Sequence, residues 1–264
     1  MKENKTGFYN QVGVPKEEIE RLKNIEFPNL VSETILNNFD LSKKRILDVG
    51  SGSNGELGRY MVGRGGVYVA VDIRKEMLTQ IKNSFELNSL PFFGVQADVA
   101  ELPFVDNQFD FSHLRFVLMH LSPKNQRRAI EETVRVTKEN IFIIDYNWRT
   151  LVSSTHSEEI KKFRKLSFEL TEQSGVDPFL GEKIEELIKE ATPNMTYRVQ
   201  KFQRKEDDYT NELIALCEVS NKIAKARLNN PDLSEKFLSL SRELKINPVK
   251  FSPPEVVVAV IDKE

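Results

Sequence analysis

A glycine-rich segment has the residue types and the spacing to hold a polar ligand. Gly50, Gly52 and Gly55 match the pattern G-x-G-x-x-G between the apolar residues 45–49 and a helical pattern that begins at Glu56. Glycines permit positive φ and let a ligand approach the backbone closely. The first amides of the following helix face such a ligand. The segment therefore predicts a ligand-binding loop, with a plain tight turn as the alternative.

Three aspartates indicate which ligand this loop would hold. Asp72 lies 22 residues beyond Gly50 at the end of the second predicted strand, where an acidic residue binds the ribose of NAD. Asp48 would repel a pyrophosphate but attract an ammonium group. Asp98, after the third predicted strand, can accept a hydrogen bond from an adenine amino group. Carboxylates after three strands suit an ammonium, a ribose diol and an adenine, which are the groups of S-adenosylmethionine.

Four segments resemble, in the right order, the class I S-adenosylmethionine-dependent methyltransferases in their small-molecule branch. They read LDVGSGSNG, VYVAVDIRKEML, VQADVAELPF and VDNQFDFSHLRFVLMHL, and a helix over 125–137 follows them. The resemblance covers residues 45–148 and implies an enzyme that uses S-adenosyl-L-methionine and releases S-adenosyl-L-homocysteine. Ser51, Asn54 and the run 138–140 depart from the family pattern. None of them replaces a side chain on which the family relies for cofactor contact.

The resemblance also implies the roles of individual cofactor-binding residues. Gly50 and Gly52 would approach the methionine part, with Asp48 near its ammonium through a backbone amide or a water. The positions expected to hold the remaining groups are Asp72 for the ribose, Ile73 and Asp98 for the adenine, the Val99 amide beside Asp98, and Arg115 for the methionine portion. The alternative for Arg115 is a salt bridge to a carboxylate of a lid.

Methyl transfer from a sulfonium is an in-line displacement that needs alignment more than acid–base help. His120 is the candidate general base, with a local structural hydrogen bond as the alternative. His113 falls inside the fourth predicted strand and is interpreted as a packed core residue. The residues expected to line the acceptor site are Tyr9 near the N-terminus and Tyr146, Asn147 and Trp148 at the end of strand five.

The elements that position these residues alternate between short apolar runs and amphipathic helices. Such alternation predicts βαβ units and a parallel sheet covered on both faces. The predicted strands are 45–49, 67–72, 92–96, 109–114, 141–146, 196–202 and 256–261, and the predicted helices are 16–24, 30–38, 56–62, 75–87, 124–137, 157–173, 181–191 and a broken stretch over 208–246. We therefore expect an α/β fold: a Rossmann-like, seven-stranded, mostly parallel sheet with its last strand antiparallel, plus a helical lid insertion.

One methyltransferase domain over 1–264 accounts for the chain. We expect it to comprise an N-terminal helical segment over 1–40, a cofactor-binding core over 41–150, a helical segment over 151–195 and a lid insertion over 206–247 between the last two strands. Phe27 and Pro28 are expected to separate the two N-terminal helices, because proline disfavours helix in the residue before it.

Composition excludes several classes of function. The 264 residues include 38 basic and 40 acidic ones, for a net charge of −2, so nucleic-acid binding is not indicated. The single cysteine, Cys217, excludes an intramolecular disulfide and a cysteine-based zinc site, and three histidines leave no expectation of a metal. The longest aliphatic run, residues 256–261, is far shorter than the roughly 20 residues that span a bilayer. The N-terminus has no apolar signal region, which favours a cytoplasmic location.

The sequence thus predicts a methyltransferase acting on the oxygen, nitrogen or carbon of a small organic acceptor. No Asn-Pro-Pro-aromatic motif follows strand four and no Pro-Cys pair exists, so a nucleic-acid acceptor is disfavoured. No membrane partner is expected, and both a monomer and a homodimer are compatible with the sequence. The alternatives are an NAD-dependent oxidoreductase that uses the glycine loop and a non-catalytic S-adenosylmethionine-binding protein.

Overall fold

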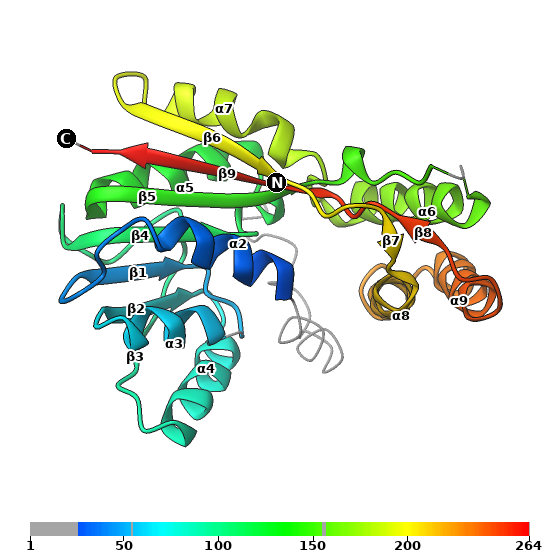
Figure 1. Ribbon diagram of the computed structural model, residues 1–264, viewed down its shortest axis with the longest axis horizontal. Coiled ribbons are helices and arrows are strands. Elements are labelled where there is room, and N and C mark those ends of the chain that lie inside the picture. The colour runs from blue at the N-terminus through cyan, green and yellow to red at the C-terminus, as the bar shows by residue number, and fades with distance from the viewer. Residues whose placement is uncertain (1–25, 54, 155–156, 264) are drawn as a thin grey trace.

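The computed structural model describes residues 26–53, 55–154 and 157–263 (Figure 1). The predicted helix 16–24 and the predicted site residue Tyr9 lie outside these ranges. Within them, no helix combines the length and the apolar character that a bilayer-spanning segment requires.

A seven-stranded sheet forms the centre of the molecule, with strand order β3-β2-β1-β4-β5-β9-β6. Strands β1 to β5 pair in parallel, and β9 pairs antiparallel with both β5 and β6. The bounds are β1 Arg45–Val49, β2 Val67–Asp72, β3 Phe93–Gln96, β4 Phe109–Arg115, β5 Thr137–Asn147, β6 Thr196–Phe202 and β9 Glu255–Asp262. The predicted fold class is confirmed.

Helices cover both faces of this sheet, as the alternating pattern requires. On one face lie α2 Glu26–Leu36, α3 Glu56–Gly63 and α4 Lys75–Leu87, whose apolar side chains share a core with Ile46 and Phe142. On the other face lie α5 Pro123–Val136 and α7 Leu180–Ala191, which pack on Leu47 and Ile143. Side chains from adjacent positions of one strand therefore enter different cores.

Among the boundaries that differ from those predicted, two affect the site. Within the described residues, helix α2 includes Phe27 and Pro28, which were expected to separate two helices. Proline is tolerated in the first turn of a helix, where the N–H that it lacks would have no intrahelical partner. Strand β5 begins at Thr137, directly after α5, so residues 138–140 belong to the strand and not to a turn. The Thr137 side chain anchors this junction by hydrogen bonding to Ser112 and to the Thr133 carbonyl oxygen.

A second unit of helices lies beyond the carboxyl ends of β4 and β5 (Figure 1). It consists of α6 Glu158–Ser174, α8 Thr210–Ala226 and α9 Pro231–Ile246, with a small pair of strands, β7 Asp207–Asp208 and β8 Lys250–Phe251. Its buried side chains form a core separate from the two cores of the sheet. We call α6, α8 and α9 the helical unit. Residues 151–195 therefore divide, because α6 joins this unit whereas α7 packs on the sheet.

Candidate functional site

The loop from β1 to α3 lies at the carboxyl edge of the sheet. Gly50 has φ +69° and Gly52 has φ +61°, a conformation that glycine adopts without steric cost. A Cβ at Gly50 would lie 2.5 Å from Val117 Cγ2, whereas a Cβ at Gly52 would meet no described residue within 4 Å. Gly50 is therefore required by packing, and Gly52 faces open space in which a ligand can approach the backbone.

Two serines of this loop carry the observation that tests whether a polar ligand fits there. The hydroxyl oxygens of Ser51 and Ser53 are buried and have no hydrogen-bond partner among the residues that the structure describes. A buried hydroxyl without a partner costs free energy, about 1–3 kcal/mol. Hydroxyls without partners beside the open space at Gly52 fit a ligand rich in polar groups, such as the amino-acid part of S-adenosylmethionine.

Asp72 joins the glycine loop to the end of β2. Its Oδ2 accepts a hydrogen bond from the Gly52 amide at 2.9 Å, and its Oδ1 accepts one from the Arg74 amide at 2.9 Å. Burial raises the pKa of this carboxyl, while the two amides oppose the shift. Each carboxylate oxygen has a second lone pair, so Asp72 retains acceptor capacity for two hydroxyl groups.

The next strand end supplies the other predicted cofactor residues. Asp98 follows β3, and its Oδ1 accepts a hydrogen bond from the Ala100 amide at 2.9 Å. Val99 is buried, and Ile73 is half-buried with its carbonyl oxygen accepting from the Gln96 side chain. Because β2 and β3 are parallel neighbours, these residues lie along one edge of the sheet.

Asp48, expected near the ligand's ammonium through a backbone amide or a water, is anchored beneath the glycine loop. It is only 5% exposed, and its Oδ2 accepts a hydrogen bond from the Tyr68 hydroxyl at 2.7 Å. Its Oδ1 lies 3.4 Å from His113 Nδ1, and Ser32 Oγ lies 3.5 Å from His113 Nε2. Burial lowers the pKa of His113. His113 is therefore buried as predicted, but it belongs to a polar network beneath the glycine loop.

Arg115 at the end of β4 contacts the N-terminal helix. Its Nη1 donates a hydrogen bond to Asn29 Oδ1, and Asn29 Nδ2 donates to Glu56 Oε2 at 2.6 Å. Burial lowers the pKa of Arg115, and the nearby carboxylates of Asp48 and Glu56 oppose that shift. Within the described residues no ion pair joins Arg115 to a lid carboxylate. Sequence reasoning missed Asn29, since nothing local signals a contact across 86 positions.

The ends of β4 and β5 carry an aromatic cluster. Phe116 and Tyr146 stack in parallel, with ring centroids 4.3 Å apart, and Trp148 lies 5.6 Å from Tyr146. Asn147, in contrast, is only 3% exposed, and its side chain caps the short helix that begins at Trp148 by accepting from the Arg149 amide. Tyr146 and Trp148 thus form a half-buried aromatic surface, whereas Asn147 supports the backbone beneath it.

A half-buried histidine, His120, and a fully buried aspartate, Asp145, lie at the same edge. Burial lowers the pKa of His120 to about 3, and the nearby Arg227 adds to that shift. Burial raises the pKa of Asp145 to about 8; its carboxylate accepts hydrogen bonds from the Met119 and Tyr146 amides. With this pKa, the His120 imidazole is neutral at pH 7 and is a weak base. No local pattern in the sequence predicts the raised pKa of Asp145, because the complete burial of this residue depends on tertiary packing.

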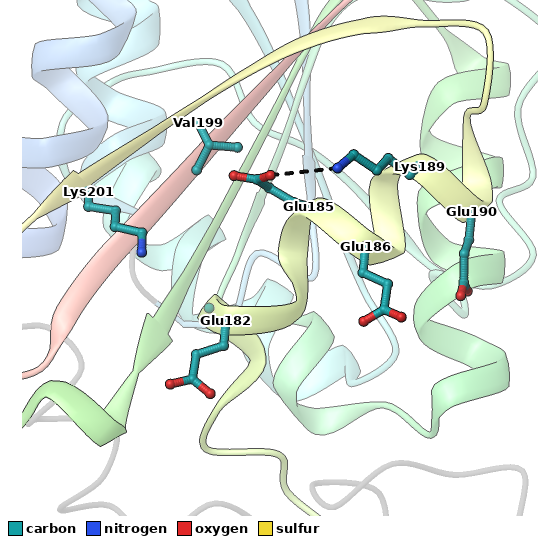
Figure 2. A pocket seen from close by; sticks show the side chains of 8 residues that line it. Glu182, Glu185, Glu186, Lys189, Glu190, Val199 and Lys201 are labelled. Carbon is teal, nitrogen blue, oxygen red and sulfur yellow. Dashed lines mark ion pairs between the residues drawn. The ribbon is translucent and has the colours of Figure 1, made fainter.

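An open groove lies elsewhere, between α7 and strand β6 (Figure 2). Its lining consists of Gly181, Glu182, Glu185, Glu186, Lys189, Glu190, Val199 and Lys201. Glu185 and Lys189 approach within 3.9 Å, which is an ordinary surface pair on a helix. None of the predicted site residues lines this groove, so it is separate from the glycine loop.

Comparison with known proteins identifies the region built around this loop. Residues 47–144 match the family described as "Methyltransferase domain". The ubiquinone/menaquinone biosynthesis C-methyltransferase UbiE of Vibrio cholerae is 32% identical over 101 residues, which are 36% of this chain and 37% of that protein. The match therefore spans little more than a third of the curated relative.

Solved structures resemble a larger share of the chain. The YcgJ protein from Bacillus subtilis covers 90% of this chain and 100% of its own, with a TM-score of 0.62 and 18% identity. A putative methyltransferase from an antibiotic biosynthesis pathway of Anabaena variabilis covers 87% of this chain and 96% of its own, with a TM-score of 0.63 and 17% identity. At this identity the likeness shows the fold, and it extends beyond the residues that match the family.

Proposed function

We propose that the protein is a class I S-adenosylmethionine-dependent methyltransferase that transfers a methyl group from S-adenosyl-L-methionine to a small organic acceptor, because residues 47–144 match the family described as "Methyltransferase domain". The single observation that carries this proposal is the glycine loop. It combines an open approach at Gly52 with the buried hydroxyls of Ser51 and Ser53, which have no partner in the part of the chain that the structure describes. The family match supports this cofactor over NAD.

In this proposal, the carboxyl ends of the first four strands each bind a different part of the cofactor. The loop amides and the hydroxyls of Ser51 and Ser53 hold the amino-acid part, and Arg115 faces its carboxylate. Asp72 accepts hydrogen bonds from the ribose hydroxyls, and Asp98 accepts one from the adenine amino group. Asp48, anchored by Tyr68, acts on the ammonium through its charge and through the loop.

The acceptor half is proposed to lie where β4 and β5 meet the helical unit. S-adenosyl-L-methionine, when bound, supplies a methyl group that its sulfonium already activates. The protein's part is to align the acceptor with that methyl group and to exclude water. Tyr146 and Trp148 support the acceptor, and residues 206–247 together with α6 cover it. With its pKa near 3, His120 is better suited to orient an acceptor than to store its proton.

Calorimetric titration with S-adenosylhomocysteine and with NAD tests the proposal. We expect S-adenosylhomocysteine to bind and NAD not to bind. Binding of NAD alone would overturn the methyltransferase assignment in favour of an oxidoreductase.

A pair of glycine variants localises the binding to the loop. Gly52 and Gly175 both have positive φ and open space where a Cβ would stand, so alanine strains both backbones equally. Gly175 ends α6, away from the loop. We expect Gly52→Ala to weaken S-adenosylhomocysteine binding at least tenfold and Gly175→Ala to leave it within twofold. Equal effects of the two variants would contradict a ligand at Gly52.

A further inference from the structure

We propose, on the basis of the proposed function, that the acceptor is a planar aromatic molecule that carries a hydroxyl group and no positive charge. The geometry points to a surface formed by Phe116, Tyr146 and Trp148 at the carboxyl ends of β4 and β5. We call these three residues the aromatic surface. They come from the carboxyl ends of β4 and β5, at the edge of the sheet from which the chain continues into α6 of the helical unit (Figure 1).

The rings of the aromatic surface form a continuous series. Phe116 and Tyr146 are nearly parallel, with an interplanar angle of 4°, and Trp148 is tilted by 57° against Tyr146. Beyond Trp148 the series reaches Phe163, which is buried in the core of the helical unit. Phe116, Tyr146 and Trp148 are only half-buried. A flat conjugated ring placed on them gains offset-stacking or edge contacts that a puckered aliphatic ring cannot make.

The backbone conformation at Phe116 shows that holding its ring in the aromatic surface strains the chain. Phe116 has φ +57°, which is rare for a bulky residue, yet its amide still donates to the Ile144 carbonyl oxygen at 2.8 Å. A bulky residue is held in this region only where the surrounding structure over-determines it, and at Phe116 this conformation accompanies the stacking of its ring on Tyr146. Strain of this kind is concentrated at ligand-binding sites.

Charged groups around the aromatic surface decide between a neutral and a cationic acceptor. The guanidinium of Arg115 lies 6.0 Å from the ring centroid of Phe116. Tyr146 interacts electrostatically with both Arg115 and Arg204. Arg204 pairs with Glu212, and Arg115 donates a side-chain hydrogen bond to Asn29 and lies near the carboxylates of Asp48 and Glu56. Because the guanidiniums of Arg115 and Arg204 both act on Tyr146, a cation beside this ring would be repelled, while a hydroxyl there that loses its proton would be stabilised.

Three probe molecules distinguish the effect of ring shape from the effect of charge on binding. Each is titrated into the protein by calorimetry, with and without saturating S-adenosylhomocysteine. They are 2-naphthol, its saturated counterpart trans-2-decalol and the cation 2-naphthylmethylamine. We expect 2-naphthol to bind at least tenfold more tightly than either of the others. Equal binding of naphthol and decalol would overturn the aromatic acceptor, and tighter binding of the amine would overturn the exclusion of cations.

Variants place the binding on the aromatic surface. We expect Tyr146→Leu to weaken 2-naphthol binding at least fivefold while S-adenosylhomocysteine binding stays within twofold. Phe168→Leu is the matched control, because Phe168 makes an edge contact with Phe179 elsewhere in the molecule. Trp148 is the only tryptophan of the chain, so quenching of its fluorescence by bound probe gives a second signal. Unchanged naphthol binding in Tyr146→Leu would overturn the proposal.

The outcome is independent of the cofactor assignment. Naphthol selectivity without S-adenosylhomocysteine binding would keep the aromatic site and reject the proposed methyl transfer. Binding of S-adenosylhomocysteine without naphthol selectivity would do the reverse.

Discussion

The two halves of the site are assembled in different ways. The glycine loop, Asp72 and Asp98 come from three consecutive strand ends within about fifty residues of chain, and backbone amides hold both carboxylates. The opposite half joins Phe116 and Trp148 to helices that lie far away in the sequence. The first half depends on local turns, and the second depends on how two separately packed cores meet. Local turns leave a motif in the sequence, whereas the meeting of two cores does not.

The largest loss of stability should come from weakening a core of the sheet or the core of the helical unit. Phe142 in the sheet and Phe237 in the helical unit are both almost fully buried. Replacing either one by alanine should cost about 3–5 kcal/mol. We expect Phe237→Ala to raise hydrogen exchange in the helical unit alone, with S-adenosylhomocysteine affinity within twofold, and Phe142→Ala to raise it throughout the sheet. If both variants open the same amides, the two halves are one cooperative unit and the comparison fails.

Removing the ribose acceptor should come next. We expect Asp72→Ala to weaken S-adenosylhomocysteine binding by about 1.5–3 kcal/mol, because two hydroxyls lose a charged acceptor. The structure adds that Gly52 loses a partner as well. Asp72→Asn is the control, since it keeps one carbonyl oxygen and should retain part of the affinity. Normal binding by Asp72→Ala, measured by calorimetry, would reject the ribose role.

Asp145 should give the acceptor half a distinct response to pH. Its pKa of about 8 in the folded protein lies above the unfolded value of about 3.9. Between these values the folded state binds a proton that the unfolded state does not, so this residue makes stability fall as pH rises from about 4 to 8. The slope is at most about 1.4 kcal/mol per pH unit.

Urea unfolding of wild type and Asp145→Asn at several pH values measures this contribution. We expect the variant to gain stability relative to wild type as pH rises towards 8. A constant difference between the two proteins across that range would show that Asp145 is ionised in the folded state.

The smallest effect concerns the network beneath the glycine loop. Tyr68→Phe removes the hydroxyl that donates to Asp48, and we expect a loss of about 1–3 kcal/mol in unfolding free energy because a buried carboxylate loses a donor. Tyr60→Phe is the matched control, since its hydroxyl donates to Asn37 at a more exposed site. Equal unfolding midpoints in denaturant for the two variants would show that Asp48 does not depend on Tyr68.

Prediction from the sequence succeeded where a signal was local. The bounds of β1, β2, β6 and α4 follow from apolar runs closed by polar or glycine residues, and the structure reproduces them. The sequence alone does not reveal that Asn147 caps a turn or that Arg115 donates to Asn29, because tertiary packing determines such partners. For the same reason His113 was interpreted as an ordinary core residue. The predicted roles of the cofactor and acceptor residues remain predictions.

The position of β9 also determines the order in which the sheet can assemble. In the strand order, β6 has β9 as its neighbour, and β9 in turn pairs with β5. Strand β6 therefore joins the sheet only through β9, which follows it in the chain, either after β9 has docked or together with it. Pairing Asn140 with Asp262 closes a loop of more than a hundred residues, a step that contact order makes slow. The helical unit lies inside that loop, so its early folding would shorten the distance that the closing strand must search.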